Sequence, residues 1–202
     1  MNALKSGLVL AILRLCSLLP LGLCRALGRG AARLYWPFRG RSRRVTERNI
    51  QGVFPELAPD AQRALAKRSL CATGELAAEL GHIWMRSWPH ISGLIREVRG
   101  SELIANAQAD GRGVIVLAPH LGNWEMIGLH LPTLGNTVSL YEPPQLESLG
   151  PVIERARERS GATLVPTDNR GLARLLKSVR SGGIAGIQAE QVPRDVNAGE
   201  NS

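Results

Sequence analysis

The sequence predicts an α/β fold, with a largely parallel sheet flanked by helices and an N-terminal apolar helix that serves as a membrane anchor. Short apolar β-branched runs alternate along the chain with amphipathic helical patterns, and Gly, Pro and polar turns separate them. Strands that alternate with helices in this way favour a parallel sheet. The chain has 202 residues, of which 44% are hydrophobic, so it is long and apolar enough to bury a core.

The apolar N-terminal stretch covers residues 7–28 and is interrupted by Arg14, Pro20 and Arg25. A clean membrane span needs about 20 consecutive apolar residues, and a central arginine is costly there. We therefore expect residues 1–30 to form a shallow or tilted anchor whose arginines reach the head groups. A buried amphipathic helix of a soluble domain is the alternative. Residues 31–202 would then form the α/β domain.

The charge of the chain predicts an acidic partner. The net charge is +8, and nearly all of the basic residues are arginine. Arginine suits phosphate and carboxylate recognition, so the candidates are anionic lipid, a phosphorylated substrate, an acidic protein or nucleic acid. Five arginines follow the apolar stretch and are placed to face anionic head groups on the cytoplasmic side: Arg39, Arg41, Arg43, Arg44 and Arg48.

Several classes of site lack support in this sequence. Aromatic residues make up only 4%, which argues against base stacking on single-stranded nucleic acid, and we expect no nucleic-acid partner. Neither a G-x-G-x-x-G nor a G-x-x-x-x-G-K motif occurs, so nucleotide binding is not indicated. The three cysteines form no C-x-x-C pair, and we expect neither a metal nor a cofactor.

The order of elements follows from periodicity and from turn residues. We expect helices over 43–50, 59–85, 101–109, 124–131, from 145 or 151 to 160, and from 169 to about 180. We expect strands over 95–98, from 114 to the Pro119-His120 turn, and over 137–141, 163–165 and 184–188.

His120 and Glu125 are the candidate catalytic pair, because they stand where a buried strand runs into a helix. Ligands of open α/β sheets usually bind at the carboxyl ends of strands. Within one helix, residues five apart point about 140° away from each other, so the two can meet only if His120 lies in the strand-end loop. Gly122 and Asn123 would make the bend, and Glu125 would then fix the imidazole tautomer, which makes His120 a general base. Alternatively, His120 is an ordinary turn histidine and Glu125 a first-turn carboxylate favoured by the helix dipole.

Two arginines are candidates for substrate contact. Arg157 falls within about 20° of Leu146 on the helical wheel and so continues an inward apolar face. Such an arginine either snorkels to solvent or faces a polar cavity. Arg170 follows the capping segment of the next helix, where backbone N–H groups also favour phosphate. A solvated first-turn arginine is the alternative for Arg170.

An ordered series of motifs resembles a known family. The box H120-L-G-N-W-E125 resembles the H-x4-D/E box of the lysophospholipid-acyltransferase superfamily. The wider pattern is similar to its lipid A branch, the bacterial lauroyl and myristoyl acyltransferases, and covers essentially the whole chain. The motifs that carry it are R43-R-V-x-x-R48-N49-I, F54-P-E56, V98-R-G, G111-R-G-V-I-V-L-A-P, L140-Y-E-P-P144, R155-A-R-E-R-S-G161, N169-R-G171 and A189-E-Q-V-P193.

The resemblance implies a glycerolipid-acyltransferase-like fold and transfer of a fatty acyl chain from acyl carrier protein to a hydroxyl of a phosphorylated lipid A precursor. It implies lipopolysaccharide biosynthesis at the cytoplasmic face of the bacterial inner membrane, without metal or cofactor. On this model His120 is the base and Glu125 orients it. Substrate binding would fall to Asn123, Arg157, Arg170 and Glu190.

The chain departs from the family pattern in three places. Glu190 stands where the family usually has Asp, and Glu142 stands where it often has Arg. The family's Phe-Phe-Gly region and last helices are missing, so we expect the α/β domain to be incomplete at its C-terminus and to expose an apolar sheet edge. Two alternatives stay open: a non-catalytic, truncated membrane-surface protein that binds anionic lipid, and an acyltransferase for a glycerolipid or ornithine-lipid acceptor.

Overall fold

The structure is a computed structural model that describes residues 2–144 and 147–188. The chain divides into two compact units, Met1–Arg86 and Ser87–Ser202. The division therefore falls after Arg86, whereas the sequence suggested a limit near residue 30, which lies inside a helix of the first unit.

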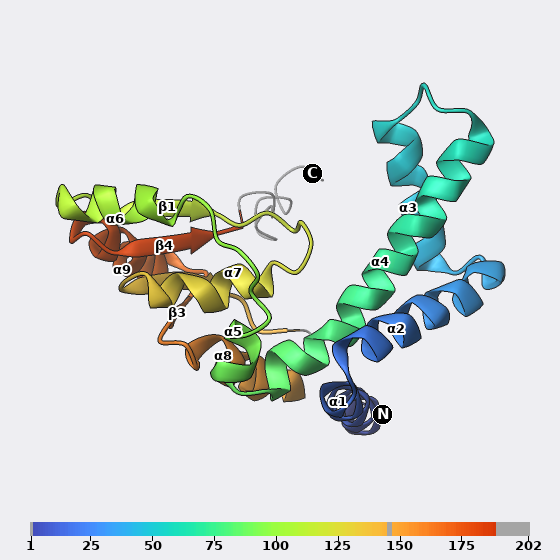
Figure 1. The fold of residues 1–202 in the computed structure, drawn as a ribbon, viewed down its shortest axis with the longest axis horizontal. Helices are drawn as coiled ribbons and strands as arrows, with labels where there is room; N and C mark the ends of the chain where they lie inside the picture. The colour runs from blue at the N-terminus through green and yellow to red at the C-terminus, as the bar shows by residue number, and fades with distance from the viewer. Residues whose placement is uncertain (1, 145–146, 189–202) are drawn as a thin grey trace, which may run out of the picture. The chain divides into compact units, whose positions relative to one another are not determined.

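The first unit is helical and is organised on its longest helix, α4 (Pro59–Met85). The helices α1 (Asn2–Leu18), α2 (Leu21–Tyr35) and α3 (Arg41–Val53) all contact α4, and the short η1 (Trp36–Phe38) connects α2 to α3 (Figure 1). The predicted helix over 59–85 is confirmed. Its start at Pro59 suits a residue that has no N–H to donate.

The apolar N-terminal stretch forms two helices instead of the one that we expected. Pro20 stands between α1 and α2 with a ψ of 138°, outside the helical range. Because proline removes a backbone donor and clashes with the preceding turn, a continuous helix through residue 20 is disfavoured. Within residues 2–144 and 147–188, no helix combines the length and the apolar composition needed to cross a bilayer.

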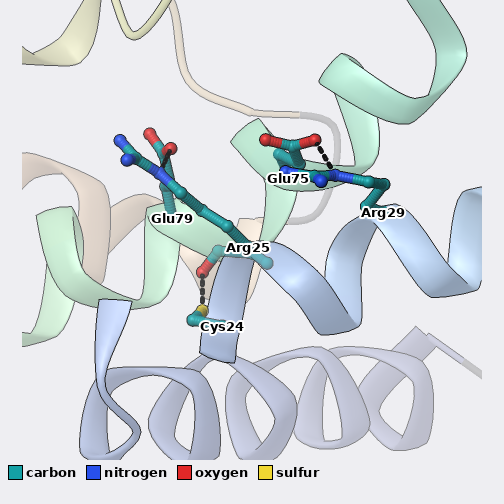
Figure 2. A network of polar contacts seen from close by, with 6 residues as sticks. Cys24, Arg25, Arg29, Glu75 and Glu79 are labelled. Carbon is teal, nitrogen blue, oxygen red and sulfur yellow. Dashed lines mark hydrogen bonds and ion pairs between the residues drawn. The ribbon is translucent and has the colours of Figure 1, made fainter. Parts of the chain in front are cut away.

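Helices α2 and α4 approach each other closely at two glycines. A Cβ atom on Gly28 would overlap the carbonyl oxygen of Gly74, and a Cβ on Gly74 would overlap that of Gly28. Two ion pairs flank this contact: Arg25 Nε lies 2.5 Å from Glu79 Oε1, and Arg29 Nε lies 2.6 Å from Glu75 Oε1 (Figure 2). Only glycine at both positions lets the two backbones come this near.

Cys24 lies fully buried in the same interface. Its thiol donates to the carbonyl oxygen of Ala78 at 3.2 Å (Figure 2). Burial raises the pKa of Cys24 to about 11, and the neighbouring Cys16 and Glu79 add to the rise. The thiol therefore stays protonated at neutral pH, as expected for a small buried cysteine.

Helix α1 buries two serines and exposes a row of large apolar residues. Its buried residues include two serines, Ser6 and Ser17, beside Leu13. Gly81 of α4 faces this side, and a Cβ there would come within 2.7 Å of the Cys16 Cβ. The exposed face carries large apolar residues instead: Leu8, Ile12, Leu15 and Leu18. The contact of α1 with α4 is therefore made largely by small residues, and the large apolar residues lie outside it.

The second unit contains a four-stranded parallel sheet. Its strands are β1 (Val114–Leu117), β2 (Thr137–Tyr141), β3 (Thr163–Pro166) and β4 (Ile184–Ile187), in the order β1-β4-β2-β3. All three pairings are parallel; Ile184 pairs with both Val114 and Thr137. The prediction of an α/β fold with a parallel sheet is confirmed.

The helices of this unit begin with α5 (Trp88–Ser92) and α6 (Ser101–Ala109) ahead of the sheet. Those among the strands are α7 (Glu125–His130), η2 (Leu131–Thr133), η3 (Glu147–Leu149), α8 (Gly150–Glu158) and α9 (Asn169–Arg180). Helix α9 packs on β2, β3 and β4, and the core consists of Val138, Val165, Leu175 and Ala185.

The predicted strand over 95–98 is wrong, because residues 95–99 have no regular secondary structure. Arg96, Glu97 and Val98 are exposed, and Glu97 pairs with Arg99 only two residues away. Charged residues on both sides of the segment leave it no apolar face to bury. At the edge of the sheet, Ile115 and Leu117 of β1 are 51% and 64% exposed.

The contact between Gly28 and Gly74 predicts a contrast between two glycines of α2. We expect Gly28→Ala to lower the free energy of unfolding by about 1–3 kcal/mol, because the added methyl group forces the helices apart. Gly30 has open space around its Cα, so Gly30→Ala should be neutral or stabilise the chain by up to about 1 kcal/mol. Denaturant titration of both variants tests this; equal stability of the two would contradict the close approach.

Candidate active site

The carboxyl edge of the sheet gathers the candidate residues. Because the four strands are parallel, the segments that follow them emerge at one edge. His120 follows β1, Tyr141 ends β2, and the Asp168 cap of α9 follows β3. This edge is where ligands bind in open α/β sheets.

His120 lies in the loop between β1 and α7, as the spacing predicted. The Ala118 N–H still donates to the Ile187 carbonyl at 2.8 Å, so the loop begins directly after the sheet pairing ends. Gly122 has a φ of +58° and makes the bend. The exposed imidazole of His120 packs edge to face against Trp124, with the ring centroids 4.5 Å apart.

Glu125 is the first residue of α7 and is only 5% exposed. Both of its carboxylate oxygens accept hydrogen bonds from Arg157: Nε lies 3.0 Å from Oε2, and Nη2 lies 2.5 Å from Oε1. A fork of this kind is the strong, directional form of an arginine–carboxylate contact. The first turn of a helix also favours a negative charge.

Arg157 extends from α8 into this site. The inward face of α8 carries the buried residues Ile153 and Ala156, and Leu149 at the end of η3 is buried as well. Burial acts to lower the pKa of Arg157, but the hydrogen bonds and charge of Glu125 outweigh it and raise that pKa above its ordinary value. The wheel placed Arg157 on this inward face, yet it offered no means of identifying Glu125 as the partner.

Tyr141 is a site residue that the sequence reasoning did not select. Its ring, 8% exposed, lies beneath Arg157, whose Cζ is 5.5 Å from the ring centroid. Burial raises the pKa of Tyr141, and the charge of Glu154 adds to the rise. The signal in the sequence was its place as the last residue of a strand in the L140-Y-E-P-P144 motif.

Of the other three predicted site residues, Asn123 lies in the same loop as His120, and Arg170 lies on the far side of the sheet. Asn123 is half-buried in the turn before α7, and its carbonyl oxygen accepts from the Met126 N–H at 3.1 Å. Arg170 is exposed at the start of α9. This helix follows β3, which is the outer strand on the side of the sheet opposite to β1. Three strand spacings separate β3 from β1, about 14 Å. Glu190 lies outside the described residues.

The anion-binding role that we expected at the start of α9 has an internal competitor. The Asp168 carboxylate caps the helix by accepting from the Gly171 N–H at 2.7 Å. A second anion beside Arg170 would meet this negative charge. As for metals, the described ranges contain no group of three His, Cys, Asp or Glu side chains placed to hold an ion.

The sequence is similar to known proteins over nearly its whole length. The family model for the bacterial lipid A biosynthesis acyltransferase matches residues 2–199. The lipid A biosynthesis lauroyltransferase of Escherichia coli (strain K12) is 26% identical over 179 residues, which cover 86% of this chain and 56% of the relative. The palmitoleoyltransferase of the same strain is 25% identical over 172 residues, covering 83% and 55%.

A lipid A biosynthesis acyltransferase of Haemophilus influenzae is 25% identical over 143 residues, which cover 70% of this chain and 44% of that protein. The chain spans about half the length of the curated relatives that it matches. Since the family model extends over nearly all of the sequence, the chain belongs to the bacterial lipid A biosynthesis acyltransferase family.

Proposed function

We propose that this chain transfers a fatty acyl group from acyl carrier protein to a hydroxyl of a phosphorylated lipid A precursor at the cytoplasmic face of the bacterial inner membrane. The observation that carries the proposal is His120 in the loop after β1, with its ring packed on Trp124, the residue before Glu125 of the Glu125–Arg157 ion pair. The names of the relatives support acyl transfer in lipid A biosynthesis. The net charge of +8 suits both an acidic carrier and a phosphorylated acceptor.

The proposed step uses His120 as a general base. One imidazole nitrogen takes the proton of the acceptor hydroxyl while the hydroxyl oxygen attacks the thioester carbonyl carbon. The tetrahedral intermediate collapses, the C–S bond breaks, and the thiolate of the carrier leaves. The imidazolium then returns the proton to the thiolate, so an ester and a free thiol are formed and the base is regenerated.

We propose that Glu125 both pairs with Arg157 and orients the His120 ring. A carboxylate offers about four lone-pair sites, and the fork of Arg157 uses two of them. The remaining sites allow Glu125 to accept from the His120 ring during the reaction, which would fix the imidazole tautomer. Arg157 then acts as a positioning residue that holds Glu125, with its third nitrogen, Nη1, available to a substrate oxygen. Substrate contacts of Asn123, Arg170 and Glu190 remain part of the proposal.

Removal of the proposed base should abolish transfer. We expect His120→Ala to lower the initial rate by about 10²–10⁴-fold, the usual contribution of general base catalysis. The measurement is transfer from labelled acyl carrier protein to a lipid A precursor in membranes that contain the chain. His130→Ala, which removes another histidine from the same helix–loop segment, should keep the rate near that of the unchanged chain.

Equal rates for His120→Ala and the unchanged chain would rule out this mechanism. No transfer by a folded, membrane-bound chain would favour the non-catalytic alternative, in which it only binds anionic lipid. Transfer to a glycerolipid or ornithine lipid, without transfer to the lipid A precursor, would retain the mechanism and change the acceptor.

The fork between Arg157 and Glu125 predicts a stability effect that is specific to one arginine of α8. Arg157→Met leaves a buried carboxylate without its partner, and we expect it to lower the free energy of unfolding by about 2–4 kcal/mol. This is slightly below the range for fully buried pairs, since the Arg157 side chain is 29% exposed.

The matched control is Arg155→Met, which changes an exposed arginine on the same helix. It should alter stability by no more than about 0.5 kcal/mol. Denaturant unfolding of both variants provides the comparison. Equal losses would mean that the contact with Glu125 contributes little, and the positioning role of Arg157 would have to be abandoned.

We propose further that the exposed face of α1 lies in the membrane surface. Leu8 and Leu15 are each 63% exposed on that face, while the packed face carries serines. An exposed apolar stripe on a helix too short to span suits an interfacial anchor. Arg14, exposed on α1, would reach the head groups.

Vesicle flotation tests the anchor. Leu8→Gln combined with Leu15→Gln should weaken vesicle binding at least about tenfold, because each buried leucine contributes roughly 1.5–3 kcal/mol. Leu103→Gln with Leu172→Gln removes two exposed leucines from the other unit and should change binding little. If both pairs reduce flotation equally, α1 is not the anchor.

A further inference from the structure

An arginine-lined hollow lies in the first unit, between α3, α4 and Arg39, two residues before α3. Its volume is about 580 Å³, within the usual range of ligand sites. Four arginines line it, against a single carboxylate, that of Glu47: the arginines are Arg39, Arg43, Arg44 and Arg63. No reaction step proposed above uses any of these residues.

Arg43 is the fixed part of this hollow. Its side chain is only 6% exposed, its Nε donates to Glu47 at 2.8 Å, and its Nη1 donates to the Trp36 carbonyl oxygen at 2.8 Å. The guanidinium also lies over the Trp36 ring, 4.2 Å from the centroid. These two bonds use Nε and Nη1 and leave Nη2 out, so the guanidinium of Arg43 is oriented while it lines the hollow.

Arg44, another arginine of the hollow, is oriented by a neutral group instead of a carboxylate. Arg44 Nη1 donates to the carbonyl oxygen of Arg39 at 2.9 Å, and Arg39 itself has a φ of +50°. A neutral carbonyl orients Arg44 but does not cancel its charge. Arg63 comes from α4, so the positive charges approach the hollow from two helices.

The local backbone adds to this positive charge. Helix α3 has no acidic residue in its first turn and no side chain that caps its N-terminus. Arginines in the first turn oppose the helix dipole instead of balancing it. The carboxylate of Glu47 is already engaged by Arg43, so the hollow has an excess of charge that an anion of the right geometry would neutralise.

We propose that this hollow binds a phosphate group, carried either by a lipid head group or by a free phosphate. Phosphate presents several oxygens to several guanidinium forks at once, and arginine favours this bidentate geometry over simple charge contact. The site lies in Met1–Arg86, whereas His120 belongs to the second unit, so the proposal adds a binding function to the proposed acyl transfer.

Two matched double variants of the full chain test the site. Arg44→Gln with Arg63→Gln removes one lining arginine from each of α3 and α4. Lys67→Gln with Arg68→Gln removes two exposed cations from α4 that do not line the hollow. The probes are inorganic phosphate, measured by calorimetry, and phosphatidylcholine vesicles with and without phosphatidic acid, measured by flotation.

The lining pair should weaken binding at least about tenfold, because it removes charge-assisted hydrogen bonds to the phosphate oxygens. The control pair should leave it nearly unchanged. A selective loss with inorganic phosphate identifies the free anion as sufficient, and a loss seen only with phosphatidic acid identifies a lipid source; both support the site.

Two outcomes overturn the proposal. Equal losses from both pairs would mean diffuse attraction to positive charge, and binding of neither probe by the unchanged chain would mean that the hollow holds no phosphate. None of these measurements requires acyl transfer, so their failure leaves the proposed function untouched.

Discussion

The ion pair between the buried Glu125 and the partly exposed Arg157 is the interaction on which the candidate site depends. It joins residues 32 positions apart and fixes the start of α7 against α8. An isolated carboxylate that is 5% exposed would be costly, and the guanidinium fork offsets that cost. Trp124 packs on the His120 ring and directly precedes Glu125, so the position of the proposed base follows from this pair. Changes that move α8 should therefore act on His120 without touching it.

Arginine has two roles in this chain: some arginines pair with acidic residues of the protein, and others are left to bind an external anion. Arg25 and Arg29 pair with Glu79 and Glu75 between two helices, and Arg157 compensates one buried carboxylate. These cations are balanced locally and contribute to structure. The arginines of the hollow outnumber its one carboxylate, that of Glu47. Part of the chain's excess positive charge thus lies where an external anion, not an internal acid, is the suitable partner.

Local sequence patterns predicted most of the helices and strands, but they did not predict which of them contact one another. The helices over 59–85 and 101–109 and four of the five strands were readable, because periodicity and Gly or Pro punctuation act within a short window. The strand over 95–98 was wrong, since a short β-like run still needs a neighbour to pair with. The wheel placed Arg157 inward, yet Glu125 as its partner depends on how α7 and α8 meet. Likewise, apolar content suggested one anchor helix, whereas Pro20 divides the stretch into two helices and the packing of α1 on Gly81 of α4 decides which face of α1 is outside.

The surroundings of His120 favour a long apolar acyl donor over a small polar one. Leu117 at the end of β1 is 64% exposed, and Leu121, directly after the histidine, is 80% exposed. A general base flanked by exposed leucines places an apolar surface beside the reacting atom. A fatty acyl chain would bury this surface as it brings its thioester to the imidazole, and the gain of roughly 25 cal/mol per Å² would help to orient the donor. The same burial would displace water, which competes with the lipid hydroxyl for the thioester. The apolar residues that look out of place on a soluble sheet edge are therefore consistent with the chemistry proposed for it.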